Sequence, residues 1–537
     1  MNKLISLLIE AFLILCGFII LTAGDPFLSS ELQESFRSHP RYHRLLISVV
    51  ASLGIFLFAV LHRKYNRTSG LFSFVRKINL SFLTLSAILF VFFSILFAYS
   101  SYIRHKVFAS SFDFAIFSQA IWNTAHGSFL YSSIKGGVCL LGDHVSPFLI
   151  LFSPLFSFEF RPELLLVLQA IGAVSGIFPL FLLAKKVLNE DSLAFLFVIS
   201  FLLYLPLRNS IRFDFHPEIF AISFLLWAFY WLITNRLMLS SLALLLTLST
   251  KEVACLPVAF VGLYALVAQR KFSFGLFWVF LSVALFFAEV KWIAPHFSGA
   301  PYFYLSGNYE AWKSEGASAF VKYLLQPSTF NYLKKIFLPV GLLSYLSPTA
   351  LLLCFPALFQ NLTARNELTR SIFFQYTAYL TPFVFISTVF GLKNLIHLAG
   401  KKFPTEKVKI VAAYWLIGWS LLMSGVSEFH VIGEYQKQDT PHWEYVRTYL
   451  KQIPSSVSVR THEFFAPHLA NRKELHIFEN NHPKEGGSAK AQNTEYIILD
   501  RNFLSNENAQ IAELKNRGYI VQHEHDGFYV LIRNSPK

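Results

Sequence analysis

The chain has 537 residues, of which 54% are hydrophobic and 15% charged, and its mean hydropathy is +0.48. A soluble protein carries nearer about a quarter charged residues, so this composition excludes an ordinary soluble domain and indicates a polytopic membrane protein. The net charge of +14 fits basic cytoplasmic loops of such a protein, and we expect no nucleic-acid partner.

Apolar runs recur along the first 430 residues, and many approach the roughly 20 residues that a helix needs to cross a bilayer. We expect an α-helical bundle of about 11–13 spans, some of them short or tilted. The runs lie at 4–22, 44–61, 81–99, 163–184, 192–206, 217–234, 237–250, 253–268, 273–292, 336–346, 348–361, 373–392 and 409–427.

Basic residues concentrate in four of the connecting segments, at 62–77, 185–186, 270–271 and 393–409. Cytoplasmic loops of membrane proteins are enriched in Lys and Arg, so all four segments are expected in the cytoplasm. This predicts a multi-pass protein of the cytoplasmic (inner) membrane with a cytoplasmic N-terminus. A loop at 100–162 and everything after 428 then lie on the extracytoplasmic side.

The composition changes after Val431, where polar sequence replaces the apolar runs. Short strand-like runs alternate with the helical pattern "NAQIAELKNRG", which predicts a small extracytoplasmic α/β domain. We therefore expect three parts: two leading spans and a basic cytoplasmic loop at 1–80, a transmembrane domain at 81–429 and the α/β domain at 430–537.

Acids and histidines occur in four separate places that the expected topology brings to one membrane face. Ionisable groups at span ends are costly and usually face a cavity, a partner or an ion, so their convergence predicts a shared site. They are Asp113, Asp143 with His144, Asp214 with His216 and Glu218, and Lys251 with Glu252.

Each of these residues also has an ordinary structural interpretation. Asp113 could be a turn residue, and Asp143 could cap the apolar run that follows it. Glu218 after a proline is a normal first-turn acid, and Lys251 with Glu252 could be an interfacial pair.

Cations near the same face could bind a phosphate group. Arg208 and Arg212, four residues apart and just before Asp214, are the first pair to consider, because a guanidinium binds phosphate oxygens in a planar fork. The alternative is that such side chains anchor the protein at the membrane interface.

Four motifs carry a resemblance to a known family. "FDFAIFSQAIWNTAHGSFLYSS", "LGDHVSPFLILFSPLF", "RFDFHPEIFA" and "STKEVACLPVAFVGLYAL" resemble a family of predicted bacterial membrane proteins of unassigned function. That family is similar to the GT-C class of integral-membrane glycosyltransferases. The resemblance covers residues 81–310 well and the remainder more loosely, and it leaves out the first two spans.

The resemblance implies a GT-C-like bundle whose external loop carries an acid that acts as a base or a metal ligand. Asp113 falls at this position. The motifs supply Asp113, Asp143 and Asp214 as catalytic candidates and His144, His216, Glu218, Lys251 and Glu252 as substrate- or phosphate-binding candidates, beside the pair Arg208 and Arg212 noted above. If a metal binds, Asp113 and Asp214 are its expected ligands, and carboxylate ligands favour Mg²⁺ or Mn²⁺. Two departures are that Val253 stands where many members have Asp, and that the loop follows the third predicted span rather than the first.

These expectations favour a glycosyltransferase that moves a sugar from a polyprenyl-phosphate or polyprenyl-diphosphate donor to a glycan, lipid or protein acceptor on the extracytoplasmic face. Two alternatives stay open: a transporter or flippase of lipid-linked glycans, and a non-catalytic membrane assembly protein.

Overall fold

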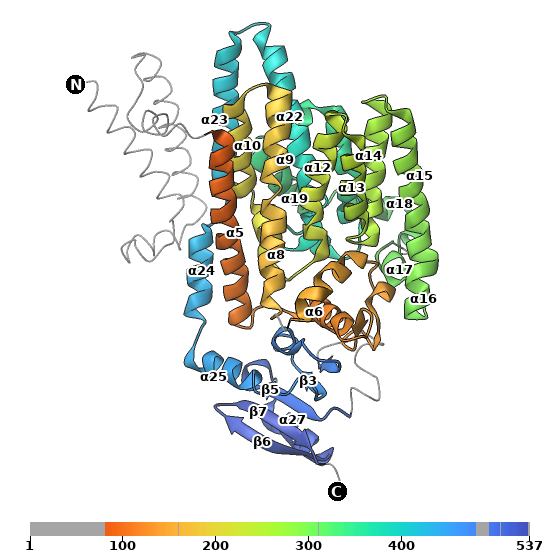
Figure 1. Cartoon of the computed structure of the whole chain (residues 1–537), viewed down its shortest axis with the longest axis vertical. Helices are drawn as coiled ribbons and strands as arrows, with labels where there is room; N and C mark the ends of the chain where they lie inside the picture. The colour runs from red at the N-terminus through yellow and green to blue at the C-terminus, as the bar shows by residue number, and fades with distance from the viewer. Residues whose placement is uncertain (1–80, 159–160, 310, 479–492, 505, 535–537) are drawn as a thin grey trace, which may run out of the picture.

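A helical bundle with a small α/β unit at one end makes up the described chain (Figure 1). The computed structural model describes residues 81–158, 161–309, 311–478, 493–504 and 506–534. The predicted spans at 4–22 and 44–61 and the basic segment at 62–77 lie outside the described residues.

The helices and strands follow one another in chain order. The helices are α5 (Phe82–Lys106), α6 (Phe112–Ala125), α7 (Ser153–Phe156), α8 (Glu163–Val174), α9 (Ile177–Leu188), α10 (Asp191–Leu203), α11 (Leu205–Arg212), α12 (Ala221–Ile233), α13 (Leu237–Leu248), α14 (Cys255–Val267), α15 (Phe272–Ala288), α16 (Ala294–Ser298), α17 (Phe303–Tyr309), α18 (Ala311–Leu324), α19 (Pro327–Phe337), α20 (Pro348–Leu351), α21 (Phe355–Thr363), α22 (Thr381–Gly400), α23 (Thr405–Leu422), α24 (Glu428–Lys437), α25 (Pro441–Leu450) and α27 (Glu507–Asn516). The strands are β1 (Tyr131–Ser132), β2 (Val138–Cys139), β3 (Val459–Thr461), β4 (Leu475–Ile477), β5 (Tyr496–Asp500), β6 (Tyr519–His525) and β7 (Phe528–Arg533).

Four helical stretches of the described chain are long and apolar enough to cross a membrane: Phe82–Lys106, Glu163–Leu188, Phe272–Ser298 and Gln375–Gly400. The pair α10 and α11, bent by 48°, could form a fifth. The predicted spans at 217–234, 237–250 and 253–268 are apolar helices of fewer than 18 residues. Helices of this length cross a bilayer only where it is thinned or the helix ends are buried in protein.

The predicted span at 336–346 is broken in the structure. Helix α19 ends at Phe337, and two short 3₁₀ turns follow, separated by Gly341 and Leu342 in the left-handed region with φ of 63° and 59°. Pro339 lacks the amide hydrogen that a continuing helix needs. The stretch at 348–361 is likewise broken, into α20, a 3₁₀ turn and α21.

The outer surface of the bundle is apolar, as expected of a protein in lipid. Helix α15 shows this most clearly, since Leu276, Phe280, Val283 and Phe287 are all exposed and Phe280 reaches 75%. The bundle interior is a core of large buried side chains, to which α15 contributes Trp278.

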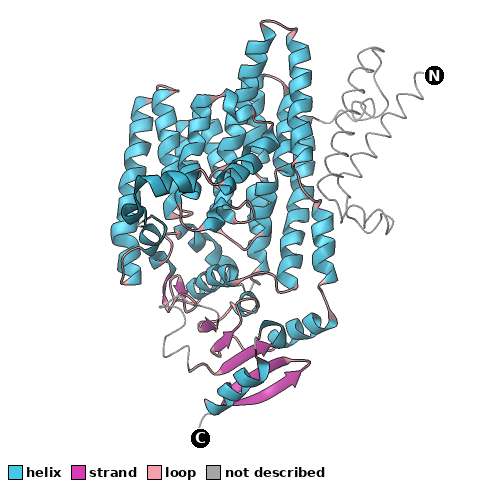
Figure 2. Cartoon of the chain, turned by 180° about the vertical axis from the view of Figure 1, so that it is seen from behind, coloured by secondary structure: helices cyan, strands magenta, loops and turns pink. Residues whose placement is uncertain are grey.

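The predicted strands of the C-terminal region are confirmed. They form a five-stranded sheet in the order β4-β3-β5-β7-β6, in which β3 runs parallel to β4 and β5 while β7 runs antiparallel to β5 and β6. Gly518 ends the α27 turn with a φ of 86°, as the sequence predicts. Figure 2 shows that the strands occur only at this end of the molecule, which we call the domain end.

The basic segments at 185–186, 270–271 and 393–409 gather at the opposite end of the bundle (Figure 1). Lys409 of α23 pairs there with Glu190, and Lys271 hydrogen-bonds Asn235. This grouping agrees with the predicted sidedness of the loops, and the orientation in the membrane stays a prediction.

Candidate functional site

The first turn of α6 is fixed by the motif that precedes α12. Asp214 is fully buried, and one of its oxygens lies 2.6 Å from Nη1 of Arg104 at the end of α5. Its other oxygen accepts hydrogen bonds from the backbone nitrogen and the hydroxyl of Ser111, the residue before α6, at 3.0 and 2.7 Å. Asp214 therefore positions the start of α6, where Asp113 lies in the first turn.

His216 of the same motif faces Asp113. Its Nε2 lies 3.6 Å from a carboxylate oxygen of Asp113, and its Nδ1 lies 2.9 Å from the carbonyl oxygen of Asp214. Gln169 of α8 accepts a hydrogen bond from the backbone nitrogen of His216 at 2.7 Å and holds the segment against the bundle. The His216 side chain is 3% exposed, whereas Asp113 is 31% exposed.

The two partners stabilise each other's charged form. Burial favours the neutral form of both groups, but the hydrogen bond and the opposite charge outweigh it, so the pKa of Asp113 is lowered and that of His216 is raised. The positive charges of Lys135 and Lys251 also lower the pKa of Asp113.

Glu252, at the start of the α14 segment, collects three donors from other parts of the chain. His144 Nδ1 lies 3.0 Å from one oxygen, and the Tyr302 hydroxyl donates to the same oxygen at 2.5 Å. The backbone nitrogen of Val145 donates to the other oxygen at 2.9 Å. Glu252, rather than the expected Asp143, thus satisfies the backbone ahead of the apolar run at 145.

Lys251 lies 3.1 Å from Glu218, and both side chains are largely buried. Burial opposes the charge of Lys251, but Glu218 and Glu252 outweigh burial and raise its pKa above the usual value. The second oxygen of Glu218 has no hydrogen-bond partner in the described part of the chain. Lys251 therefore stays charged at neutral pH. Its side chain is 12% exposed, and its charge acts on Asp113.

Asp143 lies in the segment between α5 and α8 and contacts one residue of α17 and one of its own segment. It accepts a hydrogen bond from the Tyr304 hydroxyl at 3.0 Å and lies 3.4 Å from Lys135. The Tyr304 ring stacks on His144 with centroids 4.5 Å apart, which links this pair to Glu252.

The structure thus places seven of the ten predicted residues in three contacting sets whose charges act on one another, and we call them together the acid–base cluster. Its members are Asp113, Asp143, His144, His216, Glu218, Lys251 and Glu252, together with Lys135, Tyr302 and Tyr304. Lys135 and the two tyrosines were not among the predicted site residues. The aromatic run at 299–312 was a signal for the tyrosines, whereas nothing in the sequence distinguishes Lys135.

Arg208 and Arg212 do not join the acid–base cluster. Both bind Glu428 at the start of α24, with nitrogen–oxygen distances of 3.0 and 2.9 Å. Arg208 also donates to the carbonyl oxygens of Ser424 and Val426, and Ser100 donates to Glu428. We call this the arginine–Glu428 triad.

The triad leaves little capacity for a phosphate group. Glu428 balances one of the two positive charges, but the donors of both arginines are taken: Arg208 binds Glu428 and the carbonyl oxygens of Ser424 and Val426, and Arg212 binds Glu428 through Nε and Nη2. Sequence reasoning missed Glu428 because it lies 216 residues beyond Arg212. The role of Arg208 and Arg212 as phosphate ligands stays a prediction, and this geometry does not favour it.

A metal between Asp113 and Asp214 is also not favoured by the donor geometry. Both oxygens of Asp214 are engaged by Arg104 and Ser111 and are inaccessible. In the described part of the chain no group of three or more His, Cys, Asp or Glu side chains is arranged to hold a metal ion. Binding of Mg²⁺ or Mn²⁺ stays a prediction, and we derive no chemical step from it.

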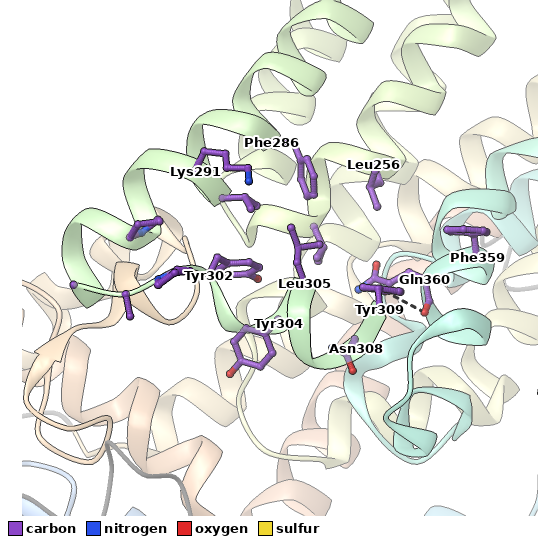
Figure 3. Close-up of a pocket in the computed structure, with 16 residues that line it drawn as sticks. Leu256, Phe286, Lys291, Tyr302, Tyr304, Leu305, Asn308, Tyr309, Phe359 and Gln360 are labelled. Atoms are coloured by element: carbon purple, nitrogen blue, oxygen red, sulfur yellow. Dashed lines mark hydrogen bonds between the residues drawn. The ribbon is translucent and has the colours of Figure 1, made fainter. Parts of the chain in front are cut away.

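An apolar cavity of about 1030 Å³ adjoins the acid–base cluster. Figure 3 shows Tyr302 and Tyr304 at one end of this cavity and Phe359 and Gln360 at the other. The tyrosine hydroxyls bind Glu252 and Asp143, so the two rings form the boundary between the cavity and the charged groups. Lys291 is the charged residue among the described lining side chains.

The α/β unit is bound to the same loop that carries Asp113. Gln119 of α6, fully buried, donates through its amide nitrogen to the carbonyl oxygens of Arg472 and Lys473 at 3.2 and 3.1 Å. Ser133 exchanges two hydrogen bonds of 2.7 Å with the backbone of Leu475 in β4. A shared apolar core joins the loop and the sheet.

A helical bundle with apolar outer faces, a folded loop after an early long helix and a charged cluster where loop and bundle meet define a polytopic membrane protein with a GT-C-like fold. Within this class, the chain belongs to the family described as "Predicted membrane protein (DUF2079)", whose pattern matches residues 104–530. No curated protein matches the sequence.

Among solved structures, the chain is similar to the crystal structure of ArnT from Cupriavidus metallidurans bound to undecaprenyl phosphate. The TM-score is 0.53 at 11% sequence identity, covering 83% of this chain and 97% of that chain. The crystal structure of the same protein in the apo state gives a TM-score of 0.47 at 11% identity, with the same coverage. ArnT is a GT-C glycosyltransferase, so the first likeness establishes the fold.

Proposed function

We propose that this protein is a membrane glycosyltransferase that moves a sugar from a polyprenyl-phosphate or polyprenyl-diphosphate donor to an acceptor on the extracytoplasmic face of the inner membrane. The observation that carries the proposal is the position of Asp113. It is the most exposed carboxylate of the acid–base cluster, two lysines act on it, and an apolar cavity adjoins the cluster.

The residues of the cluster suit the two charge changes of glycosyl transfer. The acceptor hydroxyl gives its proton to Asp113 while its oxygen forms a bond to the anomeric carbon. The bond from that carbon to the phosphate oxygen breaks, and the electron pair leaves with the lipid phosphate. Lys251 and Lys135 stabilise the negative charge that develops there.

The apolar cavity suits the lipid part of such a donor. Its lining includes Leu256, Phe286, Leu305 and Phe359, and burial of each CH₂ group contributes about 0.8 kcal/mol. The similar fold of ArnT, whose structure contains undecaprenyl phosphate, supports a polyprenyl lipid as the kind of partner.

The test is release of lipid phosphate by the purified full-length protein from a panel of polyprenyl-linked sugars. We expect release from at least one donor, and Asp113→Asn should lower the rate about 10²- to 10⁴-fold without a loss of folded protein. Asp191→Asn is the matched control, because Asp191 pairs with Lys185 at the opposite end of the bundle.

Unchanged release by Asp113→Asn would contradict the proposal, as would movement of the intact lipid-linked sugar across the bilayer without release. The second outcome would support the transporter alternative. Chelation of divalent cations in the same assay tests the predicted Mg²⁺ or Mn²⁺ requirement.

A further inference from the structure

Arg370 is a buried cation whose charge no acid of the described chain neutralises. It ends the 3₁₀ turn Glu367–Arg370 and is 7% exposed. Its Nε and Nη2 atoms are buried and have no hydrogen-bond partner among the residues that the structure describes. A buried guanidinium with unused donors is costly, and such a group calls for a missing partner such as a water molecule or an ion.

The third nitrogen of Arg370 points at the first turn of α19. Nη1 lies 3.2 Å from the hydroxyl of Ser328, 3.3 Å from that of Thr329 and 3.5 Å from the carbonyl oxygen of Tyr323. All three contacts are at the long end of hydrogen bonding. The guanidinium is therefore held beside a helix N-terminus without a strong partner of its own.

The N-terminus of α19 can attract an anion through its dipole, although Pro327 has no amide hydrogen and the amide of Thr329 already donates to the carbonyl oxygen of Gln326 at 3.0 Å. The helix has eleven residues, its capping residue Gln326 makes no side-chain capping bond, and its first turn contains no acid. The amide hydrogens of a first turn carry partial positive charge and attract anions. The partial positive charge of the helix N-terminus and the full charge of Arg370 thus lie side by side at Ser328.

Aromatic packing keeps the guanidinium in this position. Its central carbon lies 3.9 Å from the centre of the Tyr323 ring, and the Tyr323 hydroxyl is bound to the carbonyl oxygen of Ala364. The neighbouring Arg365 shows the contrast, since it stacks over Trp312 but also pairs with Glu315. Within the described ranges of the chain, Arg365 has a carboxylate partner and Arg370 has none.

We propose that Arg370, the Ser328 hydroxyl and the N-terminus of α19 bind a phosphate group, at a site separate from the acid–base cluster. None of the hydrogen-bond partners of Arg370 belongs to that cluster. The shared chemistry is a phosphate oxyanion, which a lipid headgroup or a soluble phosphate can supply. The neighbouring side chains Leu325 and Phe330 are 62% and 58% exposed and would lie beside the chains of a lipid.

Binding by the purified full-length protein tests this site. Native mass spectrometry would compare retention of phosphatidylglycerol with that of diacylglycerol, which lacks the phosphate. A thermal unfolding series would compare inorganic phosphate with chloride at equal ionic strength. Preferential retention of phosphatidylglycerol identifies a lipid headgroup, and stabilisation by inorganic phosphate identifies a soluble anion; either result supports the site if it depends on Arg370.

Arg370→Gln should weaken the preferred ligand at least about tenfold, because a charge-assisted hydrogen bond is lost. Arg365→Gln is the matched control and should bind as the wild type does. Equal binding by Arg370→Gln and wild type would overturn the proposal, as would a wild-type protein that distinguishes neither phosphate from chloride nor the two lipids.

A second variant guards against misfolding of the first. Ser328→Asp places a carboxylate beside Arg370 and should replace the ligand, so Tm without phosphate rises and the response to phosphate or phosphatidylglycerol disappears. A Ser328→Asp protein that keeps the full ligand response would overturn the proposal.

Discussion

The acid–base cluster and the arginine–Glu428 triad use the same kinds of side chain for different purposes. In the triad, two guanidinium groups close on one carboxylate, and Arg208 and Glu428 are almost completely covered. In the cluster, acids and bases from four parts of the chain alternate, and Asp113 keeps 31% of its side chain exposed. Under the proposed function, access and pairing, not charge alone, distinguish the reactive group from the structural one.

The largest effect is expected from removing the anion of the triad. Glu428→Ala leaves two guanidinium groups without their carboxylate in a covered site and should destabilise the protein by about 3–5 kcal/mol. Thermal unfolding of the full-length protein in detergent measures this loss.

Glu434→Ala provides the control for that experiment, because Glu434 lies on the same helix in an exposed pair with Lys437. Its effect should stay within about 0.5 kcal/mol. Equal stability of Glu428→Ala and Glu434→Ala would remove the distinction between the two regions.

A smaller effect is expected where the α/β unit meets the cluster. Gln119 donates to Ser133, Arg472 and Lys473 and accepts from the loop backbone, so Gln119→Ala leaves buried polar groups unpaired. We expect a loss of about 1–3 kcal/mol and easier proteolysis between the bundle and the sheet. Gln436→Ala, at an exposed bond to Tyr99, should change neither quantity.

The smallest effect is the pH dependence of the Asp113–His216 pair, because Asp113 is partly solvated. The raised pKa of His216 means that its contribution to stability is complete below about pH 6.5 and is lost as the pH rises through the folded-state pKa. The lowered pKa of Asp113 means that its contribution is present above about pH 3.9 and is lost as the pH falls through the folded-state value.

Between about pH 3.9 and about pH 6.5, the Tm difference between wild type and His216→Asn should be greatest, and it should shrink above neutral pH. A difference that grows as the pH rises would show that His216 is buried in its neutral form. Thermal unfolding across a pH series, with both proteins at equal ionic strength, measures it.

Much of this arrangement could be predicted from the sequence, and its limits have physical causes. Apolar run length and strand alternation predict most helices and all five strands of the C-terminal sheet. Pro339 indicates a break near 336–346, but apolar composition does not predict the left-handed backbone at Gly341 and Leu342.

The predicted loop topology was enough to place the acids at one membrane face, but it did not predict which cation or histidine each acid contacts. Whether Arg208 faces a substrate or Glu428 depends on how α11 packs against α24, which lies more than 200 residues away in the chain. Asp214 looks like an active-site acid in the sequence, yet its contacts to Arg104 and Ser111 give it a positioning role.

An experimental structure of the full-length protein with a bound polyprenyl phosphate tests the central claim most directly. The account predicts that the phosphate lies beside Lys251 or Lys135, close to Asp113, with the first isoprenoid units in the cavity next to Tyr302. A phosphate bound to Arg208 and Arg212, with Glu428 displaced, would contradict it.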